Sequence, residues 1–212
     1  MITLIMREIE DSRLFFIIVI ILSVAFSSMI GWKMLSIEEH QNPDIRLVVM
    51  TISILFSCGG ICIFSGLGAA QMYGDRTKKI SALLATLAIR RFTIFTARVL
   101  TGILLILLWL LPVALIVEYA TKSSPIANIG FLPMPQVWVV SFLICLASYC
   151  IGLQAGWTAS KITPTLGALG LSFVMVWVFF IKVFSPDIYV ILILLIAGSL
   201  LRAWRTFSTA AL

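Results

Sequence analysis

Six long apolar runs, almost free of charged residues, follow one another along the chain. A run of about 18 or more apolar residues is long enough to cross a hydrocarbon core of roughly 30 Å as a helix. Only 11% of the residues are charged, whereas a soluble domain carries about 25%. A chain of this composition cannot hide its apolar surface in one soluble core. We therefore predict an all-α membrane protein with six transmembrane helices.

The predicted spans take up most of the chain and leave short connections between them. Span five has the clearest start, because Thr163 stands where an N-cap is expected and Pro164 at the first helical position. Span six is the shortest, so a helical hairpin around the residues KVFSPD that only partly crosses the membrane stays open. The spans lie at about residues 14–35, 47–72, 93–119, 137–160, 164–182 and 187–203 of a single transmembrane domain, residues 1–212.

The basic residues that flank the spans predict the orientation. With the N-terminus inside and six crossings, eleven of the fifteen Lys and Arg residues fall on the inner side and four on the outer side. This asymmetry matches the positive-inside rule and predicts a multi-pass protein of the cell (inner) membrane with both termini in the cytoplasm. The net charge of +6 therefore reflects topology, and no basic soluble face for nucleic acid is expected.

A short amphipathic helix is predicted ahead of the first span. Apolar residues recur there at helical spacing, which is typical of a helix lying along the membrane interface over residues 1–13. A frayed polar start is the alternative. The recurring residues are Ile2, Ile5, Met6 and Ile9.

The longest cytoplasmic connection, GDRTKKISALLATLAIRRF at residues 74–92, is itself amphipathic. Apolar residues at positions i, i+3, i+4 and i+7 share one face and predict a helix over about residues 74–91. Asp75 near its start and the pair Arg90 and Arg91 at its end complement the helix dipole. This helix can lie on the lipid headgroups, pack under the protein's own bundle, or insert into a groove of a separate cytoplasmic protein. The four apolar residues are Ile80, Leu83, Leu84 and Leu87.

The stretch QMYGDRTKKISALLATLAIRRFTIFTARVL resembles the cytoplasmic loop of ABC-2 type transporter permeases, where a charged turn precedes a Leu-rich helix, a basic pair and a third span. The resemblance implies six spans, an N-terminal interfacial helix, and a coupling helix at about residues 74–91 that docks on a separate ABC ATPase subunit. The chain departs from the family pattern at Lys78 and Lys79, where acidic residues are common, so the groove of its partner would differ in charge. By this resemblance the ATPase interface comprises Tyr73, Asp75, Arg76, Thr77, Ile80, Leu83, Leu84, Leu87, Arg90 and Arg91.

The same resemblance implies an assembly. Two ATPase subunits would carry the ATP and Mg, and a second permease chain, as a homodimer or a heterodimer, would complete the pathway. The chain itself is expected to be no enzyme and to hold no cofactor, with the lipid bilayer as its other partner.

Small residues at spacing four within the spans predict close helix contacts. One such stripe lies in span two and a GxxxG pair lies in span four. Gln154, between the two glycines of that pair, is the most polar residue deep in a predicted span, and it either bonds across a helix contact or faces a translocation path. The helix-packing candidates are Cys58, Cys62, Gly66, Ala70, Gly152 and Gly156.

Chemistry inside the membrane would need ionisable groups within the spans. Every Lys, Arg, Asp and Glu lies in a connection or within about two turns of a span end, where long basic side chains can reach the headgroups. The lone His40 lies in an outer loop, and neither a phosphate-binding loop nor a zinc spacing of the four cysteines occurs. No catalytic, cofactor-binding or metal site is predicted.

These observations predict the permease subunit of an ATP-driven transporter of the ABC-2 type, expected to be an exporter. The absence of charge in mid-span favours an amphiphilic or bulky cargo over a small ion. The alternative is the substrate-binding membrane component of an energy-coupling factor vitamin-uptake complex, which also has about six spans but needs no long amphipathic cytoplasmic helix. A membrane enzyme or a scaffold protein forms a third class.

Overall fold

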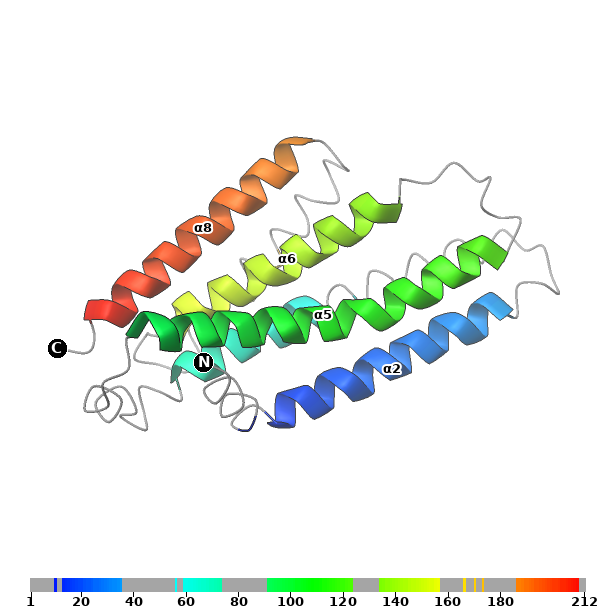
Figure 1. The fold of residues 1–212 in the computed structure, drawn as a ribbon, viewed down its shortest axis with the longest axis horizontal. Coiled ribbons are helices and arrows are strands. Elements are labelled where there is room, and N and C mark those ends of the chain that lie inside the picture. The colour runs from blue at the N-terminus through cyan, green and yellow to red at the C-terminus, as the bar shows by residue number, and fades with distance from the viewer. Residues whose placement is uncertain are drawn as a thin grey trace.

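The structure is a computed structural model that describes residues 10, 13–35, 56, 59–73, 91–123, 134–156, 166, 170, 173 and 186–209. These residues are helical apart from a turn at Gly156, and no strand occurs among them. The labelled helices are α2 (Arg13–Leu35), α5 (Arg91–Ser123), α6 (Met134–Ala155) and α8 (Pro186–Thr209), and residues 59–73 form a further helical segment. All of them run lengthwise beside one another in one bundle (Figure 1).

Three helices in the described part of the chain are long and apolar enough to cross a membrane. They cover Phe92–Ile116, Trp138–Ala155 and Tyr189–Thr209, and Arg13–Met29 is a shorter apolar helix. The predicted all-α fold with apolar spans is confirmed at this level. The predicted count of six spans stays a prediction, because much of residues 47–72 and 164–182 lies outside the described residues.

Two spans have ends that differ from the predicted ones. α5 runs for 33 residues, from Arg91 through Pro112 to Ser123, and so exceeds the predicted span at both ends. α6 stops at Ala155, before the predicted end at residue 160, and the N–H of Gly156 donates to the carbonyl of Gly152 at 3.0 Å in the closing turn. Glycine commonly follows the last residue of a helix because it tolerates the backbone angles needed there.

α8 is longer than predicted and consists of one helix of 24 residues. Pro186 takes the first helical position and Asp187 lies in the first turn, both of which favour a helix start. The helix continues past Arg202 and Arg205, and arginine is a good helix former. At about 36 Å, α8 can cross the hydrocarbon core completely. Most of the turn KVFSPD lies outside the described residues, so the alternative of a partial hairpin stays open.

The labelled helices run in two opposite directions along the bundle (Figure 1). α2 and α5 run one way along the bundle, whereas α6 and α8 both run the other way (Figure 1). Leu166, Gly170 and Phe173, between α6 and α8 in the sequence, are helical and exposed. The rest of the predicted span at residues 164–182 lies outside the described residues.

The predicted interfacial and coupling helices also fall mainly outside the described residues. Of residues 1–13, Glu10 and Arg13 are described, and Nη2 of Arg13 lies 3.2 Å from Oε1 of Glu10. Of residues 74–91, Arg91 is described, as the first residue of α5.

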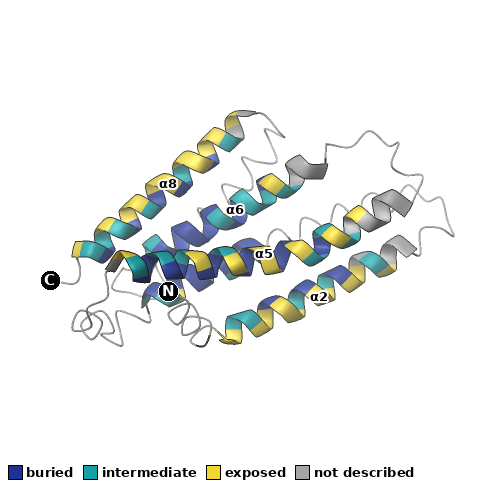
Figure 2. Ribbon diagram, viewed as in Figure 1, coloured by how far each residue is buried: buried dark blue, intermediate teal, exposed yellow. Residues whose placement is uncertain are grey.

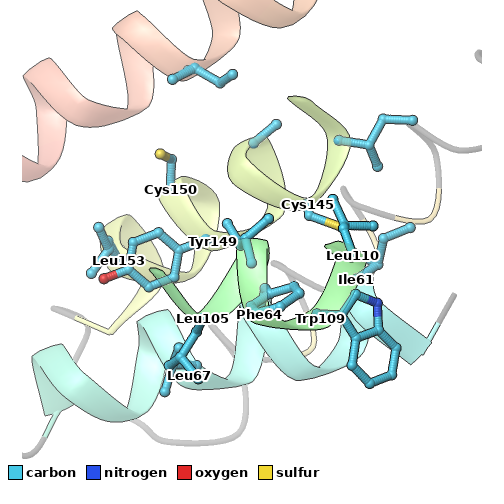
Figure 3. Close-up of a cluster of buried hydrophobic side chains, with 14 of the residues drawn as sticks. Ile61, Phe64, Leu67, Leu105, Trp109, Leu110, Cys145, Tyr149, Cys150 and Leu153 are labelled. Atoms are coloured by element: carbon cyan, nitrogen blue, oxygen red, sulfur yellow. The ribbon is translucent and has the colours of Figure 1, made fainter. Parts of the chain in front are cut away.

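The core lies between residues 59–73, α5 and α6, and Trp109 of α5 is its largest fully buried side chain. Phe56 stacks on the Trp109 ring at a centroid distance of 4.5 Å, and Phe26 and Phe64 meet it edge-on. Figure 3 shows Trp109 beside Phe64 in this cluster. By contrast, α2 and α8 carry exposed apolar side chains along their outer faces (Figure 2). Such faces fit lipid, because a soluble monomer rarely exposes large apolar patches.

Candidate functional site

The two ends of the predicted coupling segment meet at one end of the bundle. Tyr73 ends the helical segment 59–73, and Arg91 begins α5. Both lie on the left in Figure 1, where α6 and α8 also end. We call this the inner end of the bundle. The remaining residues assigned by resemblance to the ATPase interface, from Asp75 to Arg90, lie outside the described residues.

A buried polar cluster lies just inside this end. Oη of Tyr149, in α6, lies 2.7 Å from Oε1 of Gln71 and donates to the carbonyl of Arg98 at 3.0 Å. Nη1 of Arg98, in α5, donates to Sδ of Met72 at 3.8 Å. The cluster joins residues 59–73, α5 and α6 through side chains.

Arg98 overturns one expectation. Its position within two turns of a span end predicted that it would extend to the headgroups, yet it is only 3% exposed. The physical reason is that Arg98 lies on the face of α5 that packs on Met72 and Tyr149. Sequence reasoning also missed Gln71 and Tyr149. The available signal was their polar groups within otherwise apolar runs, since polar groups in lipid need partners.

Gln154 lies in the last turn of α6 and pairs with α8. With its amide oriented to suit both groups, Oε1 accepts from Nε and Nη1 of Arg202 at 3.2 Å each. The predicted span runs to residue 160, whereas α6 ends at Ala155, so Gln154 is the last residue but one of this helix. Of its two predicted roles, the geometry matches a hydrogen bond across a helix contact.

The two glycines of the GxxxG pair lie against residues 59–73. A Cβ added at Gly152 would collide with the carbonyl oxygen of Ser65, and one at Gly156 would lie 2.6 Å from the carbonyl oxygen of Ala69. Gly68 makes the reciprocal contact, since its Cβ would lie 2.5 Å from the carbonyl oxygen of Tyr149. Two helix backbones approach this closely only where no side chain stands between them.

The small-residue stripe of span two faces elsewhere. Cys62 and Ala70 are exposed, and a Cβ at Gly66 would meet nothing within 4 Å among the described residues. Cys58 lies outside the described residues. Within the described chain this stripe therefore pairs with no helix, and the packing face is the neighbouring one that carries Gly68. Its predicted role in a close helix contact stays a prediction.

A second stripe, which sequence reasoning missed, joins α2 to α5. Ser23 is buried and donates through Oγ to the carbonyl of Trp109 at 3.1 Å. Ser27 is buried one turn further on, and Gly31 approaches Ile116. Their spacing of four residues was the signal that could have revealed this face.

Aromatic rings join α5 to α8 at the inner end. Trp204 meets Phe92 edge-on at 5.6 Å and Phe95 at 5.5 Å, and it also contacts Phe207 in its own helix. Aromatic side chains commonly gather at the level of the headgroups. This placement fits an anchor at a membrane interface.

The described residues hold no group of three or more His, Cys, Asp or Glu side chains that could bind a metal ion. Cys145 and Cys150 are buried in α6, whereas Cys62 is exposed. The polar groups described above serve contacts between helices.

Comparisons with known proteins leave the family open. No protein-family model, no curated protein and no solved structure matches the chain.

Proposed function

We propose that the chain is the membrane subunit of an ATP-driven transporter of the ABC-2 type, in which the segment 74–91 docks on a separate ATPase. The proposal rests on how this segment is connected to the bundle. It follows Tyr73 directly and continues into α5 at Arg91, so that both of its ends are core helices. A force on the segment would therefore act on both of these helices.

Charge supports the orientation that the proposal needs. Arg202 and Arg205 lie in the last turns of α8, at the same end of the bundle as Tyr73 and Arg91 (Figure 1). Under the positive-inside rule this end faces the cytoplasm. A cytoplasmic ATPase could then reach the segment 74–91.

The proposed mechanism is a rigid-body change driven from the cytoplasm. Two ATPase subunits would close on ATP and Mg, and their movement would rock the helices of two permease chains between two arrangements. One chain supplies half of such a pathway, so a homodimer or a heterodimer is required. Transport out of the cell of an amphiphilic or bulky cargo fits spans whose described mid-section is apolar.

The test is co-expression with the ATPase that the proposal expects a neighbouring reading frame to encode. Leu83→Glu and Leu84→Glu place a charge on the predicted docking face, and we expect each to insert into the membrane but to lose co-purification with the ATPase. Ala85→Glu is the matched control, because residue 85 lies at least 100° around the predicted helix from each of the four apolar residues. Retained binding in both Leu variants would refute docking through this face.

A further inference from the structure

Tyr149 is fully buried at the junction of three helices. Its ring lies flat against Gly102 of α5, where an added Cβ would fall 2.5 Å from Cε1 and 2.9 Å from Cε2 of the ring. Its backbone carbonyl approaches Gly68 in the same way. Two glycines, one on each neighbouring helix, thus make the space that this one residue fills.

The hydroxyl adds directed contacts to this packing. A phenol has one proton, so Oη can donate fully to only one of its two neighbours, Oε1 of Gln71 and the carbonyl of Arg98. Within the described chain, Nε2 of Gln71 is buried without a hydrogen-bond partner. The hydroxyl thus bridges two helices, lying 2.7 Å from Oε1 of Gln71 and 3.0 Å from the carbonyl oxygen of Arg98. A continuous chain of hydrogen bonds then runs from residues 59–73 through α6 to α5.

This chain of hydrogen bonds lies where the coupling segment is attached. Gln71 is two residues before Tyr73, and Arg98 is in the second turn after Arg91. A hydrogen bond shielded from water fixes the geometry of its partners more firmly than an exposed one. These hydrogen bonds therefore fix the distance between the end of residues 59–73 and the start of α5, close to where the segment joins both helices.

We propose that Tyr149 is a positioning residue that locks the inner ends of residues 59–73 and α5 to α6, so that movement of the segment 74–90 shifts three helices as one unit. The inference rests on the proposed coupling function, because it explains how a displacement of that segment would enter the bundle. The locking itself does not depend on an ATPase and can be measured in its absence.

The experiment measures distances between spin labels in the full chain, reconstituted in lipid nanodiscs without any partner. The four native cysteines are replaced by alanine. One label pair, at Ala70 and Phe92, reports the inner end, and the other, at Met29 and Leu115, reports the outer end. All four label positions are exposed, so the labels do not disturb the core.

In the unmodified background we expect one narrow distance distribution for each pair. Tyr149→Phe should broaden the inner distribution and leave the outer one narrow. Tyr189→Phe, in α8, is the matched control and should change neither. An inner distribution that stays narrow in Tyr149→Phe would overturn the proposal. Broadening of both pairs would also overturn it, because a role in overall stability alone would loosen both ends.

Gln71→Met provides a second route if Tyr149→Phe fails to fold. We expect it to broaden the inner distribution to the same extent, and the double variant to broaden it no further, since the two side chains act through one contact. Additive broadening would overturn the shared role. Tyr149→Phe should still co-purify with the ATPase, because residues 74–90 are unchanged. Loss of ATPase binding by Leu83→Glu and loss of locking by Tyr149→Phe are thus separate results.

Discussion

With its amide turned over, Gln154 in the last turn of α6 accepts two hydrogen bonds through Oε1 from the guanidinium of Arg202 in α8, at 3.2 Å each. We expect Gln154→Met to lower the free energy of unfolding by about 0.5–1.5 kcal/mol, the usual worth of such a contact. The loss should lie at the low end because Arg202 is exposed and can be rehydrated. Thermal unfolding in detergent, with Ser208→Ala as the control, measures it. A loss no greater than that of the control would show that the pair does not hold α6 to α8.

Gly152→Ala should destabilise the bundle. The new methyl group would collide with the backbone of Ser65, which cannot move aside as a flexible side chain can. Overpacking of this kind costs about 1–3 kcal/mol. The matched control is Gly66→Ala, whose methyl group meets nothing within 4 Å among the described residues and should be neutral or stabilising, because alanine favours a helix. The same thermal assay compares the two, and equal stability would contradict the described packing.

Gly102→Ala should displace the ring of Tyr149. We expect it to cost about 1–3 kcal/mol by overpacking. Tyr149→Leu removes the ring that the new methyl group would strike, so the double variant should lose less stability than the two single variants lose together. A double-mutant cycle on unfolding free energies measures this coupling. Strict additivity would place the two residues out of contact.

Trp109→Ala should be among the most damaging single changes. The indole is fully buried among aromatic rings, and removal of a large buried aromatic side chain costs about 3–5 kcal/mol. Trp32, which is 75% exposed, serves as the control, and Trp32→Ala should be tolerated. The yield of folded protein after extraction in mild detergent distinguishes them. Similar yields for the two variants would contradict the placement of Trp109 in the core.

Fusion reporters test the orientation. Green fluorescent protein joined after Leu212 should fluoresce, because it folds in the cytoplasm, and alkaline phosphatase at the same place should be inactive. Alkaline phosphatase joined after Ser123, at the far end of α5, should be active. The reverse pattern would invert the predicted topology.

Hydrophobic run length predicted the main elements well, because a lipid-crossing helix needs a long uncharged run. It predicted the ends poorly. The end of α8 was set too early at the arginines, since charge marks the membrane surface and the helix continues beyond it. The end of α6 was predicted too late for the converse reason, because α6 stops at Ala155 while the sequence GWTAS that follows carries no charge before Lys161.

Spacing alone could not choose the packing face of residues 59–73. Small residues occur on several sides of this segment, so the stripe through Gly66 and the pair Ser65 and Ala69 beside Gly68 both show a four-residue spacing. The surface of α6 decides which face packs, and that surface depends on Gly152, which is far away in the sequence. Spacing within one run could not reveal the polar cluster around Tyr149 either, because Gln71, Arg98 and Tyr149 come from three separate runs.

The lengths of α5 and α6 have a mechanical consequence in the membrane. A helix of 33 residues is about 50 Å long, and one of 22 residues is about 33 Å long. Only the shorter one matches a hydrocarbon layer of roughly 30 Å without leaning. α5 must tilt or protrude, and in a bilayer made of shorter acyl chains it must do so further. The angle between the two helices is therefore sensitive to the thickness of the surrounding lipid.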